Sequence, residues 1–149
     1  MKHPNTLSIA VASGRIGYVY LSDGEVRDWG ISNVAAKSPE AAKSKTDFLI
    51  ESYRPDLIVT EKLSPHTRKS GQTIGNVQAV EEAAIASDAQ HIAVEHIQHH
   101  ANKYLEMNEL AQRHPVLASW LPTKRKLWES EDRRASIWEA LALVEQADL

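Results

Sequence analysis

Two glycine turns near the start of the chain separate three short apolar segments, and this feature constrains the fold most. In TLSIAVASGRIGYVYLSDGEVRDWGIS, hydrophobic runs occupy residues 6–12 and 15–21, and the pattern resumes over 25–32. The breaks fall at Ser13-Gly14 and at Ser22-Asp23-Gly24. An Asp-Gly pair between two hydrophobic runs is a strong signal for a β-hairpin. The sequence therefore predicts three antiparallel strands in succession.

Helical periodicity then alternates with short strands. Ser38-Pro39 is typical of a helix N-cap followed by proline at the first helical position, and Arg54-Pro55 is expected to end that helix. The later segments are expected as a buried strand (56–61), a helix (72–87), a strand (91–95), a helix (102–113), an irregular stretch (115–122) and a helix (131–145). The helix over 72–87 is expected to bury a stripe formed by Ile74, Val77, Val80, Ala84 and Ile85. This order predicts an α/β fold with a mixed sheet and helices on its faces.

Composition excludes several classes of function. The chain has 149 residues, which suits one domain over 1–149, and it has no cysteine, which excludes disulfides, thiolate catalysis and cysteine-ligated zinc. No apolar run approaches the ~20 residues of a membrane helix, and the first five residues lack the hydrophobic core of a secretory signal. We therefore expect a cytoplasmic protein. The net charge of −3 means that nucleic acid would have to bind to a local basic patch.

Four segments, in order along the chain, carry a more specific pattern. They are SIAVASGRIGYVYL, YRPDLIVTEKL, TRKSGQTIGNVQAV and SIWEALALV, which together run from about residue 7 to residue 145. As an ordered set they resemble the RuvC family of Holliday junction resolvases, within the ribonuclease H-like superfamily. The resemblance implies a ribonuclease H-like mixed sheet and an endonuclease that acts on branched DNA.

The resemblance also implies a cofactor. The family hydrolyses phosphodiesters with two Mg²⁺ or Mn²⁺ ions, which in two-metal sites lie about 3.5–4 Å apart. Its carboxylates come from the first strand, the fourth strand and the last helix. Glu61 matches the fourth-strand glutamate and Glu139 the final helix acid, so both are expected to be catalytic metal ligands.

The other two acid positions of the family are not matched. The earlier helix acid falls at Ser136, which supplies no charge. Asp132 lies seven residues before Glu139, on the same helix face, and is the candidate substitute, although an acid near a helix N-terminus also suits the helix dipole. The first-strand aspartate falls at Ala10, or at Ala12 if the turn is shorter. No register brings a carboxylate to this strand.

Two basic segments are candidates for phosphate contacts. Arg68 and Lys69 lie in the loop after the buried strand, and Lys124, Arg125 and Lys126 lie between two tryptophans, Trp120 and Trp128. Solvated loops and core tryptophans are the alternative interpretation. The resemblance further suggests a homodimer, because a two-fold dimer can match a two-fold junction; the helix over 72–87 is the expected interface.

The segment EHIQHH suggests a different site. His96, His99 and His100 have a spacing that could bind a transition metal, or they could be surface residues. Glu95, at the end of a strand, could join the carboxylates around Glu61.

Two hypotheses of function therefore stand. One is a divalent-metal-dependent endonuclease on branched DNA, supported by Glu61 and Glu139. The other is a degenerate RuvC-like domain that binds nucleic acid or a protein partner without cutting, supported by the missing first-strand acid and by Ser136. A purely structural role is supported only by the net negative charge.

Overall fold

The computed structural model describes residues 4–97, 102–122 and 132–147. The strands and helices within these ranges follow the expected order closely. The elements are β1 (Thr6–Ala12), β2 (Arg15–Ser22), β3 (Glu25–Ser32), η1 (Val34–Ala36), α1 (Pro39–Tyr53), β4 (Leu57–Glu61), α2 (Gly71–Ala86), β5 (Gln90–Val94), α3 (Lys103–Arg113), η2 (Pro115–Trp120) and α4 (Ala135–Gln146). None of these helices has the length and hydropathy of a membrane-spanning segment.

The five strands form one mixed sheet in the order β3-β2-β1-β4-β5. The first three strands are antiparallel neighbours, and β1, β4 and β5 are parallel to one another. Positive φ angles at Gly14, Asp23 and Gly24 close the two hairpin turns, a conformation that glycine adopts without steric cost. The predicted α/β fold with a mixed sheet is confirmed.

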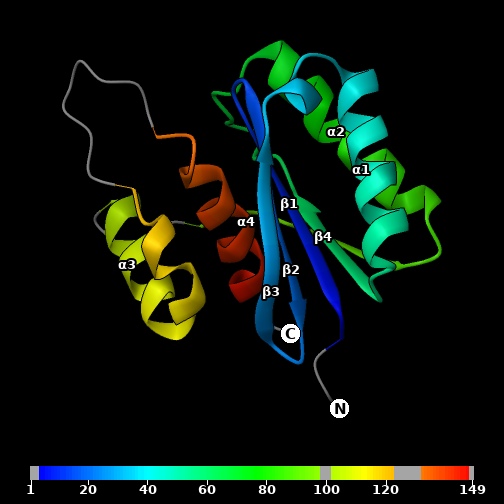
Figure 1. Ribbon diagram of the computed structural model, residues 1–149. Helices are drawn as coiled ribbons and strands as arrows, with labels where there is room; N and C mark the ends of the chain where they lie inside the picture. Colours follow the sequence, from blue (N-terminus) through cyan, green and yellow to red (C-terminus); the bar gives the residue numbers. More distant parts are fainter. Residues whose placement is uncertain (1–3, 98–101, 123–131, 148–149) are drawn as a thin grey trace.

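The helices cover the two faces of the sheet (Figure 1). α1 and α2 lie on one face, and α4 lies on the other with α3 beyond it. Successive residues of β1 point to opposite faces: Leu7, Ile9 and Val11 pack toward α1 and α2, whereas Ala10 packs with the residues of α4. The Ser8 hydroxyl, on the same face as Ala10, donates a hydrogen bond of 2.6 Å to the Ala140 carbonyl of α4. Residues with even numbers in β1 therefore face α4.

α4 approaches the sheet most closely at Gly17 of β2. A Cβ atom placed on Gly17 would lie 2.5 Å from both the carbonyl carbon and the carbonyl oxygen of Ser136. Gly17 is paired with Ala10 in the β1–β2 ladder. The start of α4 therefore rests on the sheet beside Ala10, one of the two positions at which the resemblance places the first-strand aspartate.

Helix α1 begins and ends as the sequence predicts. The Ser38 hydroxyl accepts a hydrogen bond from the Ala41 N–H, and Pro39 occupies the first turn. Arg54 takes a left-handed conformation, with φ of 46°, directly before Pro55. Local signals therefore account for this element fully.

Two expectations about the helices are wrong in detail. The last helix begins at Ala135 and not at 131, because the Asp132 carboxylate accepts a hydrogen bond from the Arg134 N–H and closes a turn there. Ile85 is 62% exposed, although its place in the stripe predicted burial. α2 buries Thr73, Asn76, Val77 and Val80 against α1 and the sheet, and Ile85 falls outside that face.

Candidate functional site

A pocket of about 190 Å³ lies where the carboxyl ends of β1 and β4 meet α4 and the segment after β5. This is the edge of a parallel sheet where ligands commonly bind. The residues that line it include Ala10, Glu61, Lys69, Glu95, His96 and Glu139. The structure therefore brings the two principal acids of the sequence analysis to one place.

Glu61 reaches the pocket because of strand alternation. It is the last residue of β4, and Val59, two residues earlier, packs in the cluster that contains α4. The Glu61 side chain thus points to the face on which Ala10 lies. It is 16% exposed, so its charge is only partly solvated.

Glu139 enters the same pocket from the opposite side, on α4. It is half-buried, between the fully buried Trp138 and Ala140. Glu139 therefore lies at the boundary of the core. Two carboxylates thus face one cavity from a strand and a helix.

The two remaining acid positions of the resemblance are buried and uncharged. Ala10 lines the pocket and is 2% exposed, whereas Ala12 does not line it. Of the two candidate positions on β1, position 10 is therefore the one that lies at this pocket. Ser136 is completely buried, its hydroxyl donates to the Arg133 carbonyl at 2.9 Å, and its backbone rests on Gly17.

Asp132, the candidate substitute acid, lies outside this pocket. Its carboxylate accepts hydrogen bonds from the guanidinium of Arg134 at 2.7 and 3.0 Å. These bonds are the main reason that the pKa of Asp132 is lowered. Asp132 lines a different cavity, of about 610 Å³, with Ile31, Trp120 and Arg133.

The two loop cations predicted for phosphate contact lie differently. Arg68 is exposed, but the Lys69 ammonium turns into the pocket. It donates to the Val11 carbonyl at 2.8 Å and lies 3.3 Å from the Glu61 carboxylate. Lys124, Arg125 and Lys126 lie outside the described residues.

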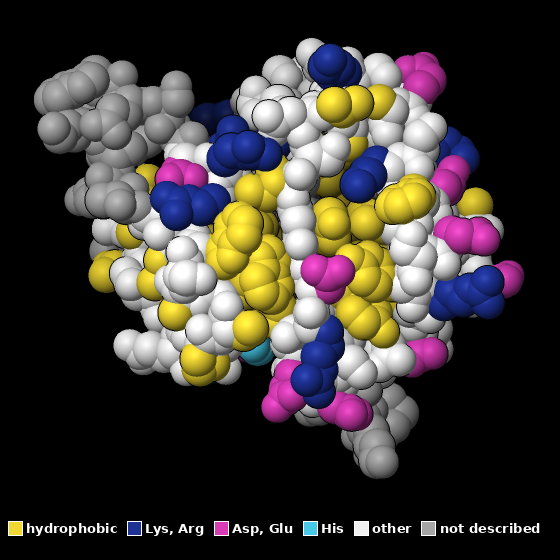
Figure 2. All heavy atoms as spheres, in the orientation of Figure 1, with side chains coloured by type: hydrophobic (Ala, Val, Ile, Leu, Met, Phe, Trp, Pro, Cys, Tyr) yellow, Lys and Arg dark blue, Asp and Glu magenta, His cyan; other side chains and the backbone are white. Residues whose placement is uncertain are grey.

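Of the four tryptophans, three are described. Trp138 is buried, and its indole N–H donates to the Trp120 carbonyl. Trp120 is 36% exposed and contacts Trp29 edge to face, with ring centroids 6.1 Å apart. Hydrophobic side chains are visible on both sides of edge strand β3, with basic side chains beside them (Figure 2). An aromatic surface thus adjoins Arg133 and Arg134 at the start of α4.

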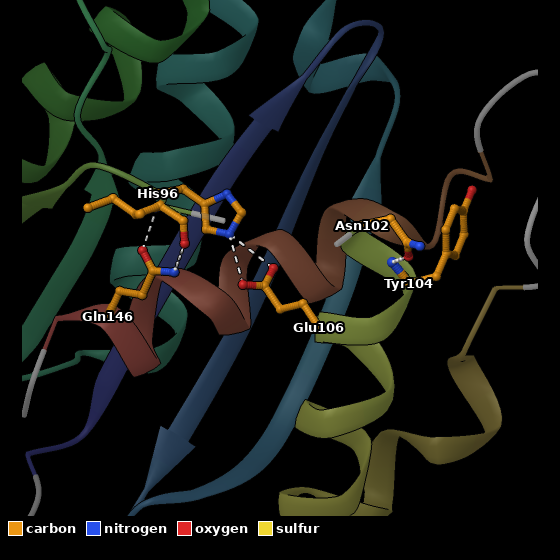
Figure 3. Close-up of polar contacts among 6 residues, drawn as sticks. His96, Asn102, Tyr104, Glu106 and Gln146 are labelled. Atoms are coloured by element: carbon orange, nitrogen blue, oxygen red, sulfur yellow. Dashed lines mark hydrogen bonds and ion pairs between the residues drawn. The ribbon is translucent and has the colours of Figure 1, made fainter. Parts of the chain in front are cut away.

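His96 pairs with a residue that the sequence analysis missed (Figure 3). Its Nε2 donates to both carboxylate oxygens of Glu106, at 3.0 and 3.1 Å, and Glu106 is almost fully buried on α3. The hydrogen bond to Glu106 raises the pKa of His96, with smaller contributions from Glu139 and Glu61. The sequence could have indicated Glu106, because it is a glutamate on the buried face of a helix, in the turn after Asn102.

Of the three histidines of the predicted metal site, only His96 lies within the described residues. His99 and His100 lie outside the described residues. Among the residues that are described, no group of three His, Asp or Glu side chains is placed to hold an ion. His96 is instead engaged by Glu106.

We expect His96→Gln to destabilise the fold in a pH-dependent way. Because the pKa of folded His96 lies above its usual value, the charged pair stabilises the protein fully below pH ~6.5 and less as pH rises through the folded pKa. Urea unfolding should show a loss of about 1 kcal/mol at pH 6 that shrinks by pH 9. The exposed His66, changed to Gln, is the control. An equal loss at both pH values for His96→Gln would contradict this account.

The residues present do not fit a two-metal centre. Such a centre needs carboxylates from several segments to converge on hard cations. Ala10 and Ser136 supply none, and the Lys69 ammonium already lies against Glu61. Glu95 lines the pocket but is exposed. We therefore derive no catalytic step through a metal.

Comparisons with known proteins agree on the fold. No family model matches the chain, and no curated protein matches its sequence. The structure of Thermus thermophilus RuvC superimposes with a TM-score of 0.62 at 12% identity, covering 93% of this chain and 89% of that one. The Fowlpox virus Holliday junction resolvase gives 0.61 at 10% identity, covering 97% and 99%. The yeast mitochondrial resolvase Ydc2 gives 0.57 at 11% identity, covering 95% and 78%.

These likenesses establish the RuvC-like fold. The Thermus thermophilus and Fowlpox virus proteins are also known in complex with Holliday junction DNA. The ribonuclease H-like fold class expected from the sequence is thus confirmed, as is the resemblance to RuvC-like resolvases in fold.

Proposed function

We propose that this chain is a degenerate RuvC-like domain that binds branched DNA and does not cut it efficiently. The observation that carries the proposal is the burial of Ala10 and Ser136, the two positions at which the fold's other acids would stand. Both positions are packed between the sheet and α4, and neither offers a ligand for a metal. The fold and the likeness to junction-bound resolvases support branched DNA as the partner.

The binding face would be the one around the pocket. Arg68 and Lys62 are exposed on the loop after β4, and Arg133 is exposed at the start of α4 beside the Trp120 surface. Cations of this kind bind phosphates, and an exposed indole can stack on a base. Lys124, Arg125 and Lys126 remain predicted contacts of the same class.

The test is a binding assay with a labelled four-way junction and a linear duplex, in EDTA, Mg²⁺ and Mn²⁺. We expect salt-sensitive binding that prefers the junction, and no cutting in any buffer. Arg68→Ala should weaken binding about three- to tenfold and lower the slope of log K against log salt by about one. Arg27→Ala, at the far end of the sheet in a pair with Glu25, is the matched control. Equal effects of the two substitutions, or no junction binding at all, would contradict the proposal.

A metal-dependent endonuclease is the second candidate. It is favoured by one observation, that Glu61, Glu95 and Glu139 all line the same pocket. Junction cutting in Mg²⁺ or Mn²⁺ that Glu61→Gln abolishes would support this candidate over the first.

A homodimer through α2 remains a prediction. The exposed Ile85 on this helix is a residue that such an interface could bury. Sedimentation of the purified chain and of the Ile85→Glu variant would measure the oligomeric state.

A further inference from the structure

We propose that the Lys69 ammonium is the resident cation of the pocket and takes the place that a divalent metal would hold between the ends of β1 and β4. The proposal concerns the charge balance of the pocket and does not depend on whether the chain binds DNA. It follows from the disagreement between the fold, which implies metal ions, and the residues that line this pocket.

The position of the ammonium is the first argument. It bridges the Val11 carbonyl, near the end of β1, and the Glu61 carboxylate, at the end of β4. Oxygens of these two kinds, a backbone carbonyl and a carboxylate, are also ligands of hard divalent cations. Lys69 thus contacts oxygen atoms of the kinds that a divalent cation takes as ligands.

The backbone of Lys69 is held in place, which is the second argument. Its N–H donates to the Thr67 hydroxyl at 3.2 Å, and the next residue, Ser70, caps α2 by accepting from the Thr73 N–H. The loop is therefore anchored on both sides of Lys69. Its side chain is only 27% exposed, which agrees with an internal role rather than a solvated one.

The positive charge of Lys69 affects how the pocket can bind divalent ions. One positive charge beside Glu61 offsets part of the negative charge of Glu61, Glu95 and Glu139 in the same pocket. A divalent ion would have to displace the ammonium or bind against its charge, and like charges a few ångströms apart repel strongly where solvent is limited. The protein as it stands should bind divalent ions weakly at this site.

The experiment is a titration with Mn²⁺ alone, followed by isothermal calorimetry and by the change in Tm. We expect weak binding to the protein with Lys69 and at least about tenfold tighter binding to Lys69→Met. Mn²⁺ should also raise the Tm of Lys69→Met, because a ligand that binds only the folded state stabilises it. Adding Glu61→Gln to Lys69→Met should remove both effects.

Lys62→Met is the matched control. Lys62 lines the same pocket, but its side chain is exposed and makes no ion pair with Glu61 in the described structure. If Lys62→Met gains as much Mn²⁺ affinity as Lys69→Met, general charge explains the effect and the proposal fails. It also fails if Lys69→Met binds Mn²⁺ no better than the unchanged protein, or if its gain survives Glu61→Gln.

Discussion

Gly17→Ala is expected to lower the free energy of unfolding by about 3 kcal/mol, at the upper end of the range for overpacked cores. The added Cβ would lie 2.5 Å from the carbonyl carbon and oxygen of Ser136. Backbone atoms cannot rotate away as a side chain can, so α4 would have to move off the sheet. Urea denaturation followed by circular dichroism would measure the loss.

Two further variants make this prediction specific. Gly75→Ala adds the same methyl group in α2, where the nearest atom is Pro39 Cγ at 3.4 Å, and should be neutral or slightly stabilising because alanine favours helix. Ser136→Ala removes the contact of the Ser136 Oγ at 2.6 Å but should not rescue Gly17→Ala, since the backbone carbonyl of Ser136 would still lie 2.5 Å from the added Cβ. Rescue by Ser136→Ala, or a cost for Gly17→Ala no larger than for Gly75→Ala, would show that α4 does not approach as closely as described.

The fold could be predicted because its signals are local. Ser13-Gly14 and Asp23-Gly24 mark the hairpins, and Pro39 and Pro55 bracket the first helix, each through backbone angles that its own residues dictate. The spacing of hydrophobic residues then changes from the period of a strand to the period of a helix, and this order of elements leaves few possible arrangements of the sheet. The start of α4 was misjudged because a side chain, Asp132, competes with the helix for the Arg134 N–H.

The site could be predicted only in part, because it depends on tertiary placement. The resemblance pointed to Glu61 and Glu139, and both line the pocket, while their role as metal ligands stays a prediction. The choice between Ala10 and Ala12 needed the pocket itself, which Ala10 lines and Ala12 does not. The sequence does not indicate that the Lys69 side chain points into the pocket, because a cation in a loop of basic residues is usually exposed.

The two positions at which the resemblance expects acids, Ala10 and Ser136, are coupled through one structural contact. Ala10 is paired with Gly17, and Gly17 lies under Ser136. Two buried carboxylates at these neighbouring positions would repel each other and carry a large cost of desolvation unless cations compensated them. Small neutral residues at both positions let α4 rest directly on the sheet. The contact of Lys69 with Glu61 fits the same balance, because the ammonium offsets part of the negative charge of the pocket.

Ala10→Asp combined with Lys69→Met is expected to make folding depend on metal. The double variant places a new carboxylate in the pocket beside Glu61 and Glu139 and removes the resident ammonium. In EDTA, the free energy of unfolding should fall by about 3 kcal/mol or more, the usual cost of a buried charge without a partner. Millimolar Mn²⁺ should restore most of it, because the carboxylates can then bind the ion. Urea unfolding in the two buffers measures the difference.

The single variants separate the contributions. Ala10→Asp alone should lose less stability in EDTA, because Lys69 still supplies a cation, and should respond less to Mn²⁺ than the double variant. Ala12→Asp is the positional control: it adds the same charge to the end of β1, outside the pocket, and should show no Mn²⁺ response. If Mn²⁺ stabilises Ala12→Asp as much as the double variant, or leaves the double variant unchanged, then the pocket is not the place where this fold would hold its metal. Junction cutting by the double variant in Mn²⁺, with none by Ala12→Asp, would show that the scaffold lacks only the groups that these two substitutions change.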